Sequence, residues 1–258
     1  MPANARPLDG LCVWVTRPED QARALAEPLR HLGAKVLYQP AITISDPPAW
    51  GGVDAVCRRL DAFDWLVFSS VNGVSYFLGR LRFLDGDLHR LADAKLAAIG
   101  PATADALAEA GLPVALVPRS YRAEALADAL AESAVGLRFL LIRASRGREV
   151  LAERLAAAGA VVEQVVAYTS EDIRQPRPEV AEALTAGRID WITVTSSAIA
   201  RSLVALFGPA LRNARLASIS PITSKALDAL GYPPAAEAVE YTMAGVVDAI
   251  VAAEREKA

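Results

Sequence analysis

The chain has 258 residues, of which 53 % are hydrophobic and 22 % charged, and its formal net charge is −3. This composition is typical of a globular protein with a large core, and the length suits one large domain or two ordinary ones. The small negative charge and the lack of a basic run argue against a nucleic-acid-binding protein. The apolar runs are of strand length, too short to span a membrane.

The sequence has few residues that could bind a metal ion or take part in redox chemistry. Cys12 lies in the apolar run LCVWV and Cys57 in an expected helix, so both are predicted to be buried apolar side chains. His31 and His89 stand alone and no C-x-x-C motif occurs, so no metal site or cofactor is expected. The N-terminal segment MPANARPLDG lacks the apolar core of a signal peptide, which predicts a cytoplasmic protein.

The first half of the chain predicts strands that alternate with helices. Short runs rich in Val, Ile and Leu indicate strands near residues 11–16, 35–40, 64–69, 95–99 and 114–117. These runs show no clean alternation of apolar and polar residues, which is typical of strands buried on both faces of a parallel sheet. The helix that follows the first strand is expected to end at Gly33 and to kink or break early at Pro28.

The second half of the chain repeats the first. The matching pairs of segments are residues 11–36 with 137–162, residues 63–74 with 189–200, and residues 96–113 with 216–233. The last pair is identical at nine of eighteen positions without a gap. A period this long favours a duplicated domain over a solenoid.

The order of elements predicts an α/β fold of two five-stranded parallel sheets, each covered by helices on both faces. Two proline-containing stretches lie at matching places in the two halves: AITISDPPAWGG (41–52) and YTSEDIRQPRPE (168–179). Because proline and polar residues mark connections, these stretches are predicted to be interdomain linkers.

Hydroxyl groups follow most of the predicted strands, and ligands of open parallel sheets bind beyond the carboxyl ends of the strands. The candidate ligand-binding residues are Thr16, Arg17, Ser69, Ser70, Asn72, Gly100, Thr103, Arg143, Ser145, Thr195, Ser196, Ser197, Ser220 and Thr223, and Tyr168 stands beside the second linker. Carboxylates and histidines are absent from these positions, and no nucleotide-binding glycine motif occurs. This pattern favours an anion held by neutral donors and helix N-termini.

Two interpretations stay open for each of these residues. Thr103 and Thr223 are predicted in the first turns of helices that begin at Pro101 and Pro221, where they either contact a ligand or simply cap their helices. The serine pairs are equally suited to capping, the arginines to surface ion pairs, and Tyr168 to an ordinary strand end. The matched placement of Thr103 and Thr223 in the two halves makes capping and ligand contact about equally favoured for these two residues.

The segments VTRPEDQARAL, DWLVFSSVNGV, AIGPATADAL and ISPITSKAL, in this order and spacing, resemble the uroporphyrinogen-III synthase family from about Leu11 to Val251. The resemblance implies two similar doubly wound, flavodoxin-like domains joined by a two-stranded connector, with the active site in the cleft between them. It implies that residues 1–40 plus 172–258 form domain one and residues 41–171 domain two. Contiguous repeats alone would suggest a single cut near residue 135.

The reaction that the resemblance implies is the closure of hydroxymethylbilane, a linear tetrapyrrole with eight carboxylates, to uroporphyrinogen III. The hydroxymethyl group leaves as water, the cationic azafulvene is attacked at the substituted carbon of the terminal ring, and that ring is inverted through a spiro intermediate. Spontaneous closure gives isomer I instead. Such an enzyme is a lyase that controls conformation and needs neither cofactor nor metal.

The resemblance also assigns roles to residues. Tyr168 matches a tyrosine that is a candidate to assist loss of the hydroxyl group, and Thr103 and Thr223 match two helix-start threonines. The residues that match the family's hydroxyl-rich strand ends are Ser69, Ser70, Thr195, Ser196 and Ser197. Ser220 departs from the Gly-Pro that is usual in the family. A monomer that receives its substrate from hydroxymethylbilane synthase is expected. The alternative functions are a non-enzymatic two-domain binding protein and a sensor for an anionic tetrapyrrole.

Overall fold

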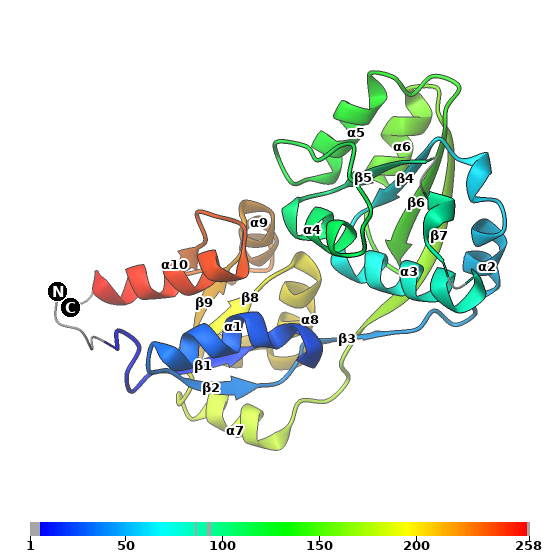
Figure 1. Ribbon diagram of the computed structural model, residues 1–258. Coiled ribbons are helices and arrows are strands. Elements are labelled where there is room, and N and C mark those ends of the chain that lie inside the picture. Colours follow the sequence, from blue (N-terminus) through cyan, green and yellow to red (C-terminus); the bar gives the residue numbers. More distant parts are fainter. Residues whose placement is uncertain (1–5, 86, 92–93, 257–258) are drawn as a thin grey trace. The chain divides into compact units, whose positions relative to one another are not determined.

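A computed structural model describes residues 6–85, 87–91 and 94–256, and the chain divides into two compact units. Unit 1 contains Met1–Thr43 and Glu171–Ala258, and unit 2 contains Ile44–Ser170. Each unit holds one five-stranded sheet (Figure 1). The predicted α/β class with two parallel sheets is confirmed.

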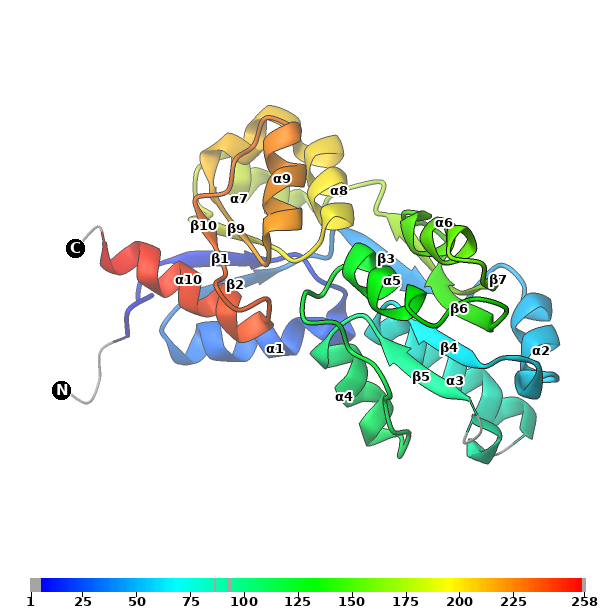
Figure 2. The same ribbon diagram turned by 90° about the horizontal axis from the view of Figure 1, so that it is seen from above.

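Unit 1 has the strand order β10-β9-β8-β1-β2. Its strands are β1 (Cys12–Val15), β2 (Lys35–Tyr38), β8 (Trp191–Val194), β9 (Arg215–Ser218) and β10 (Ala236–Glu237). Its helices are α1 (Glu19–His31), α7 (Pro178–Thr185), α8 (Ser197–Phe207), α9 (Pro221–Ala229) and α10 (Met243–Arg255), with the 3-10 helix η3 (Gly208–Asn213). Helices α1 and α10 pack on one face of the sheet, and α7, α8 and α9 cover the other (Figure 2).

Unit 2 has the strand order β3-β7-β6-β4-β5. Its strands are β3 (Ile42–Ser45), β4 (Trp65–Phe68), β5 (Lys95–Ala98), β6 (Arg138–Ala144) and β7 (Val161–Asp172). Its helices are α2 (Gly51–Cys57), α3 (Val71–Asp85), α4 (Pro101–Glu109), α5 (Ala123–Ala131) and α6 (Val150–Ala157), with the 3-10 helices η1 (Leu60–Ala62) and η2 (His89–Leu91). Among the described residues no helix is both long and apolar enough to cross a membrane.

The central strands are buried on both faces, as their unbroken apolar runs predict. In β4, Trp65 and Val67 pack against α5 and α6, whereas Leu66 and Phe68 pack against α2, α3 and α4. Successive side chains of a strand point to opposite faces, so a four-residue apolar run supplies both cores. Cys12 and Cys57 are buried, as expected.

Each sheet combines strands from both sequence repeats. In unit 1, β1 and β2 come from the first repeat and β8, β9 and β10 from the second. In unit 2, β6 and β7 come from the second repeat and β4 and β5 from the first. Both units therefore place corresponding segments in corresponding positions of their sheets.

Two local expectations differ from the structure. The segment 114–117 is not a regular strand and makes only an isolated bridge between Leu116 and Ala97. Helix α1 continues through Pro28 to His31, so the predicted early break is wrong, although the chain turns at Gly33 with φ of 101° as expected.

The two predicted linkers contain neighbouring strands, β3 and the end of β7. The chain divides into its two units inside these stretches, after Thr43 and after Ser170.

An aspartate at the start of one central strand ties it to the next strand in each unit. The Asp190 carboxylate accepts the Cys12 N–H at 2.7 Å, and the Asp64 carboxylate accepts the Arg138 N–H at 2.7 Å. The backbones of the same two aspartates also bond to strands on both sides. The Asp-Trp pair that both repeats share therefore sets the register of the strands.

We expect Asp190→Ala to lower the free energy of unfolding by about 1–2 kcal/mol, because the partly buried Cys12 N–H loses its acceptor. The matched change Asp64→Ala should have a smaller effect, because the Asp64 carboxylate is exposed and water can replace it. Urea denaturation of both variants checks this order. An equal or reversed effect would contradict the role of Asp190 as a buried acceptor.

Candidate active site

The candidate residues gather where each sheet reverses its strand order. In unit 1 this point lies between β1 and β8, and in unit 2 between β6 and β4. Neighbouring connections leave in opposite directions there, which opens a crevice beyond the carboxyl ends of the two strands. Thr16 and Thr195 follow the first pair of strands, and Ser69 and Ser145 follow the second.

Hydrogen bonds and burial hold the Tyr168 phenol in place. It lies in β7 with only 6 % of its surface exposed, and its Oη is 3.0 Å from the Ser70 Oγ. Asn72 provides a second hydrogen bond to the phenol. Ser70 itself is fixed, because its Oγ accepts the Gly73 N–H at 3.0 Å in the first turn of α3. Ser70 thus both caps α3 and contacts the Tyr168 phenol.

A register shift in β7 determines where this tyrosine points. Arg143 pairs with Val166, but the next residue of β6, Ala144, pairs with Tyr168, so β7 contains one extra residue. Such a β-bulge re-aims the side chains that follow it. The Ser145 N–H then donates to the Tyr168 carbonyl at 2.9 Å, and the Ser145 Oγ accepts the Ser170 N–H at 3.1 Å. Ser145 therefore holds the backbone on which Tyr168 stands.

Burial raises the pKa of the Tyr168 phenol, because the charged phenolate loses hydration. The hydrogen bonds from Ser70 and Asn72 and the charge of Arg146 act in the opposite direction. The phenol is accordingly neutral at physiological pH. It is surrounded by groups that stabilise the phenolate left after it donates a proton.

Tyr76 is a member of this cluster that the sequence did not single out. Its ring stacks on the Tyr168 ring with centroids 5.6 Å apart and an interplanar angle of 27°. A usable signal was present, because Tyr76 lies one helical turn after Asn72 and therefore on the same face of α3.

The two arginines at the carboxyl end of β6 have different environments. Arg143, a predicted ligand-binding residue, pairs with the Glu149 carboxylate and donates to the Gln164 side chain. Arg146 donates to the Ser170 Oγ at 3.1 Å, and its charge acts on the Tyr168 phenol. Arg143 thus matches the ion-pair interpretation, and Arg146 is the arginine associated with the tyrosine.

In unit 1 the corresponding ends form a network of hydroxyl groups. The Thr16 Oγ1 donates to the Thr193 carbonyl, and the Arg17 guanidinium donates to the Thr195 Oγ1 at 3.3 Å. Thr16 is fully buried, so its hydroxyl has a structural bond. Arg17 also bonds to the Gln21 side chain, which holds the guanidinium beside Thr195.

Serines cap two helices of unit 1, as the structural interpretation predicts. The Ser196 Oγ accepts the Ile199 N–H at 3.1 Å, and the Ser220 Oγ accepts the Thr223 N–H at 3.4 Å. The neighbouring hydroxyls of Ser197 and, in unit 2, Ser69 are directed at backbone carbonyls. These side chains therefore have structural hydrogen bonds at the ends of the strands and the starts of the helices.

Gly100 differs from Ser220 for a steric reason. A Cβ at Gly100 would lie 3.2 Å from the Cβ of Tyr121, which is closer than ordinary packing. Gly100 is the N-cap of α4, Pro101 its first residue, and no side chain caps its first turn. In the first turn of α4, Pro101 has no N–H and the Thr103 N–H donates to the Gly100 carbonyl at 3.1 Å, which leaves the Ala102 N–H without a side-chain cap. The start of α9 is instead capped by Ser220.

Thr103 and Thr223 lie in the first turns of α4 and α9, as predicted, but both side chains are buried, with 4 % and 2 % of their surface exposed. The Thr223 Oγ1 lies 3.3 Å from the Ser220 Oγ. Their burial makes both threonines part of the helix starts. Contact with a ligand stays a prediction for both.

The arrangement is suited to proton transfer from one phenol and to binding of anions by neutral donors. No group of three or more His, Cys, Asp and Glu side chains within residues 6–85, 87–91 and 94–256 is arranged to hold a metal ion. The chemistry of the candidate site is therefore that of the phenol and the hydrogen-bond donors described above.

Comparison with known proteins identifies the family. Residues 23–248 match the family model described as uroporphyrinogen-III synthase HemD. The chain belongs to the uroporphyrinogen-III synthase family. A uroporphyrinogen-III synthase of Synechococcus elongatus is 31 % identical over 95 % of this chain and 96 % of its own length.

Solved structures of family members share the fold. A mutant uroporphyrinogen III synthase from Thermus thermophilus superposes with a TM-score of 0.68 at 21 % identity, covering 96 % of this chain and 100 % of its own. A second structure, from Helicobacter pylori, gives a TM-score of 0.63 at 18 % identity, covering 94 % and 98 %. These matches establish the fold of the uroporphyrinogen-III synthase family for this chain.

The pKa of Tyr168 gives a direct test of the site. We expect the difference in tyrosinate absorbance between the wild-type protein and Tyr168→Phe to show a midpoint above pH 10.0, the ordinary value. Ser70→Ala should move this midpoint higher still, because the Ser70 hydrogen bond lowers the pKa. Since the folded-state pKa is raised, this group's contribution to stability is present below pH 10 and is lost as pH rises through the folded pKa. A midpoint at or below 10 would contradict the described burial.

Proposed function

We propose that this protein is a uroporphyrinogen-III synthase, a lyase that closes hydroxymethylbilane to uroporphyrinogen III with inversion of the terminal ring and loss of water. Membership of the family supports the reaction. The observation that supports it at the level of chemistry is the neutral, buried Tyr168 phenol held by Ser70 beside Arg146.

In the proposed reaction the Tyr168 phenol donates its proton to the hydroxyl group of the substrate. The carbon–oxygen bond breaks, water leaves, and the azafulvene cation remains with the phenolate. Ser70, Asn72 and Arg146 stabilise that phenolate, since the same groups oppose the rise of the tyrosine pKa. The proton released when the closed ring regains its aromatic form returns to the phenolate, so the tyrosine is regenerated.

The donors at the strand and helix ends are proposed to bind the substrate carboxylates. The start of α4 is the strongest candidate, because no side chain caps its first turn. Arg17 of unit 1 is a second candidate, held next to Thr195. Thr103, Thr223 and the serines that cap helices would act by fixing these backbone donors. Several neutral donors suit a flexible polyanion whose conformation must be controlled.

Other expectations belong to the same proposal. A cytoplasmic location, a monomeric state and direct transfer of substrate from hydroxymethylbilane synthase stay predictions. Independence from a cofactor is proposed on the same basis, since proton transfer and positioning need only the side chains named above.

The isomer ratio of the product tests the function. Hydroxymethylbilane, generated in place from porphobilinogen by its synthase, should give mainly isomer III when this protein is added and isomer I when it is absent. Oxidation to the porphyrins and chromatographic separation measure the ratio. Binding of the tetrapyrrole with isomer I as the sole product would instead indicate a binding protein and contradict the synthase.

The role of Tyr168 is tested separately. We expect Tyr168→Phe to lower kcat for isomer III formation by about 100-fold with a small change in KM, as for removal of a general acid. Tyr232→Phe is the matched control, because Tyr232 packs on Arg212 in unit 1 and should retain wild-type rates. A Tyr168→Phe variant with an unchanged kcat would remove the phenol from the proton transfer.

A further inference from the structure

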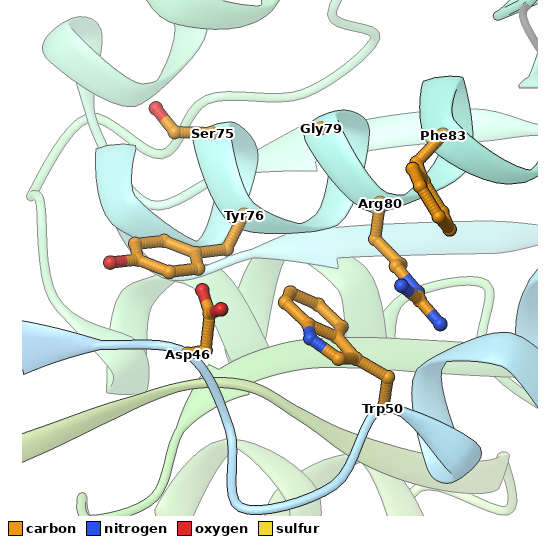
Figure 3. A pocket seen from close by; sticks show the side chains of 7 residues that line it. All are labelled: Asp46, Trp50, Ser75, Tyr76, Gly79, Arg80 and Phe83. Atoms are coloured by element: carbon orange, nitrogen blue, oxygen red, sulfur yellow. The ribbon is translucent and has the colours of Figure 1, made fainter.

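A pocket in unit 2 lies between α3 and the segment that follows β3. It has a volume of about 380 Å³, within the range of about 300–1,000 Å³ that small-molecule sites occupy. Its lining residues are Asp46, Trp50, Ser75, Tyr76, Gly79, Arg80 and Phe83 (Figure 3). None of these belongs to the candidate active site except Tyr76, whose ring also stacks on Tyr168.

Gly79 leaves space in the pocket where any other residue would place a side chain. It lies inside α3, and a Cβ at this position would meet nothing within 4 Å. Its φ is not positive and neighbouring atoms leave room, so neither the backbone nor the packing requires glycine here. Glycine destabilises a helix interior relative to alanine, and its other common use is close approach of a ligand to the backbone.

The positive charge in the pocket is already paired. Arg80 donates to both Asp54 carboxylate oxygens, at 2.7 and 2.8 Å. Its guanidinium also lies 4.9 Å from the Trp50 ring centroid and 4.8 Å from that of Phe83. Asp54 and the two aromatic rings thus fix the planar guanidinium of Arg80 at one side of the pocket.

Asp46 adds a second negative charge beside Arg80, and the hydrogen bond and charge of Asp54 and the charge of Asp46 raise the Arg80 pKa. Its carboxylate is exposed and lies near the Tyr76 and Trp50 rings in Figure 3. The charges of Arg80 and Arg58 both act on the Asp54 carboxylate, so the carboxylate that lines the pocket itself is that of Asp46. Pro47 and Pro48 follow Asp46 and restrict the backbone that carries it.

We propose that this pocket is a binding site for a small planar cation, such as a guanidinium or amidinium group attached to an apolar body. The cation pairs with the Asp46 carboxylate, and the flat body lies against the aromatic rings of Trp50 and Tyr76 beneath Gly79. Carboxylates with aromatic faces are a recurrent means of binding organic cations.

This site is distinct from the one proposed for the tetrapyrrole. The Asp46 carboxylate that would pair with a cation repels a polycarboxylate, so the substrate is not its ligand. The inference therefore does not rest on the proposed function, and its test measures binding instead of product formation.

Benzamidine is a suitable probe, with benzamide as its neutral counterpart of the same shape and benzoate as the anionic one. Trp50 fluorescence reports binding, because Trp50 is half-buried whereas Trp14, Trp65 and Trp191 are buried. We expect benzamidine to bind the full-length protein about five- to tenfold more tightly than benzamide, and benzoate to bind most weakly. Calorimetry with Trp50→Phe checks the assignment of the signal.

Two pairs of variants locate the site. Asp46→Asn should make the affinities for benzamidine and benzamide equal, whereas Asp61→Asn, which changes another exposed carboxylate of unit 2, should leave them unchanged. Gly79→Leu should abolish binding of both probes by filling the pocket, whereas Gly79→Ala should retain most of it. Circular dichroism confirms that α3 is intact, and both residues are better helix formers than glycine.

The proposal is overturned if benzamidine binds no more tightly than benzamide, or if neither binds at millimolar concentration. It is equally overturned if binding survives Gly79→Leu in a folded protein. Loss of selectivity in Asp46→Asn together with loss of binding in Gly79→Leu supports it, whatever the outcome of the isomer assay.

Discussion

The carboxylates of Asp64 and Asp190 control the register of the two central strands in each sheet, and the positions of the functional side chains depend on that register. Each carboxylate accepts the first N–H of the neighbouring strand, and each backbone bonds to strands on both sides. A shift of one residue would exchange the two faces of a strand. It would also move Ser69 and Ser70 relative to Ser145. The hydrogen bonds of the two aspartates therefore set both the packing of the core and the positions of the polar side chains at the strand ends.

Tyr168 shows how a buried phenol can be both neutral and ready to donate. Burial alone would make its ionisation unfavourable, and the bulge in β7 is what turns the side chain into the buried position. Ser70, Asn72 and Arg146 partly offset that effect. The ring of Tyr76 restricts the phenol further. These local contacts suit the proposed donation of the proton and its recovery.

Periodicity and duplication predicted the fold class, most of the strands and the helix starts, because those features depend on local sequence. Composition alone did not predict the strand Ile42–Ser45 in the first linker, because this strand forms by pairing with β7; only the family resemblance implied a two-stranded connector. Position alone identified Ser70 and Tyr168 but not their contact. The pairing of Arg143 with Glu149 was likewise invisible, because the hydrogen-bond partners of long side chains follow from packing.

The two sequence copies carry matching hydroxyl groups at their strand ends, but only the second copy has a tyrosine at the position of Tyr168. Continuing their alignment places Ile42 opposite Tyr168, so the first copy has no phenol at this position. The backbone differs as well: the first copy is broken between β2 and β3, where Pro40 cannot donate a ladder hydrogen bond, whereas β7 runs unbroken from Val161 to Asp172. Duplication thus explains why both units carry corresponding helix starts and hydroxyl groups at the ends of their strands. The single tyrosine fits a reaction in which one hydroxyl group leaves from one end of the substrate.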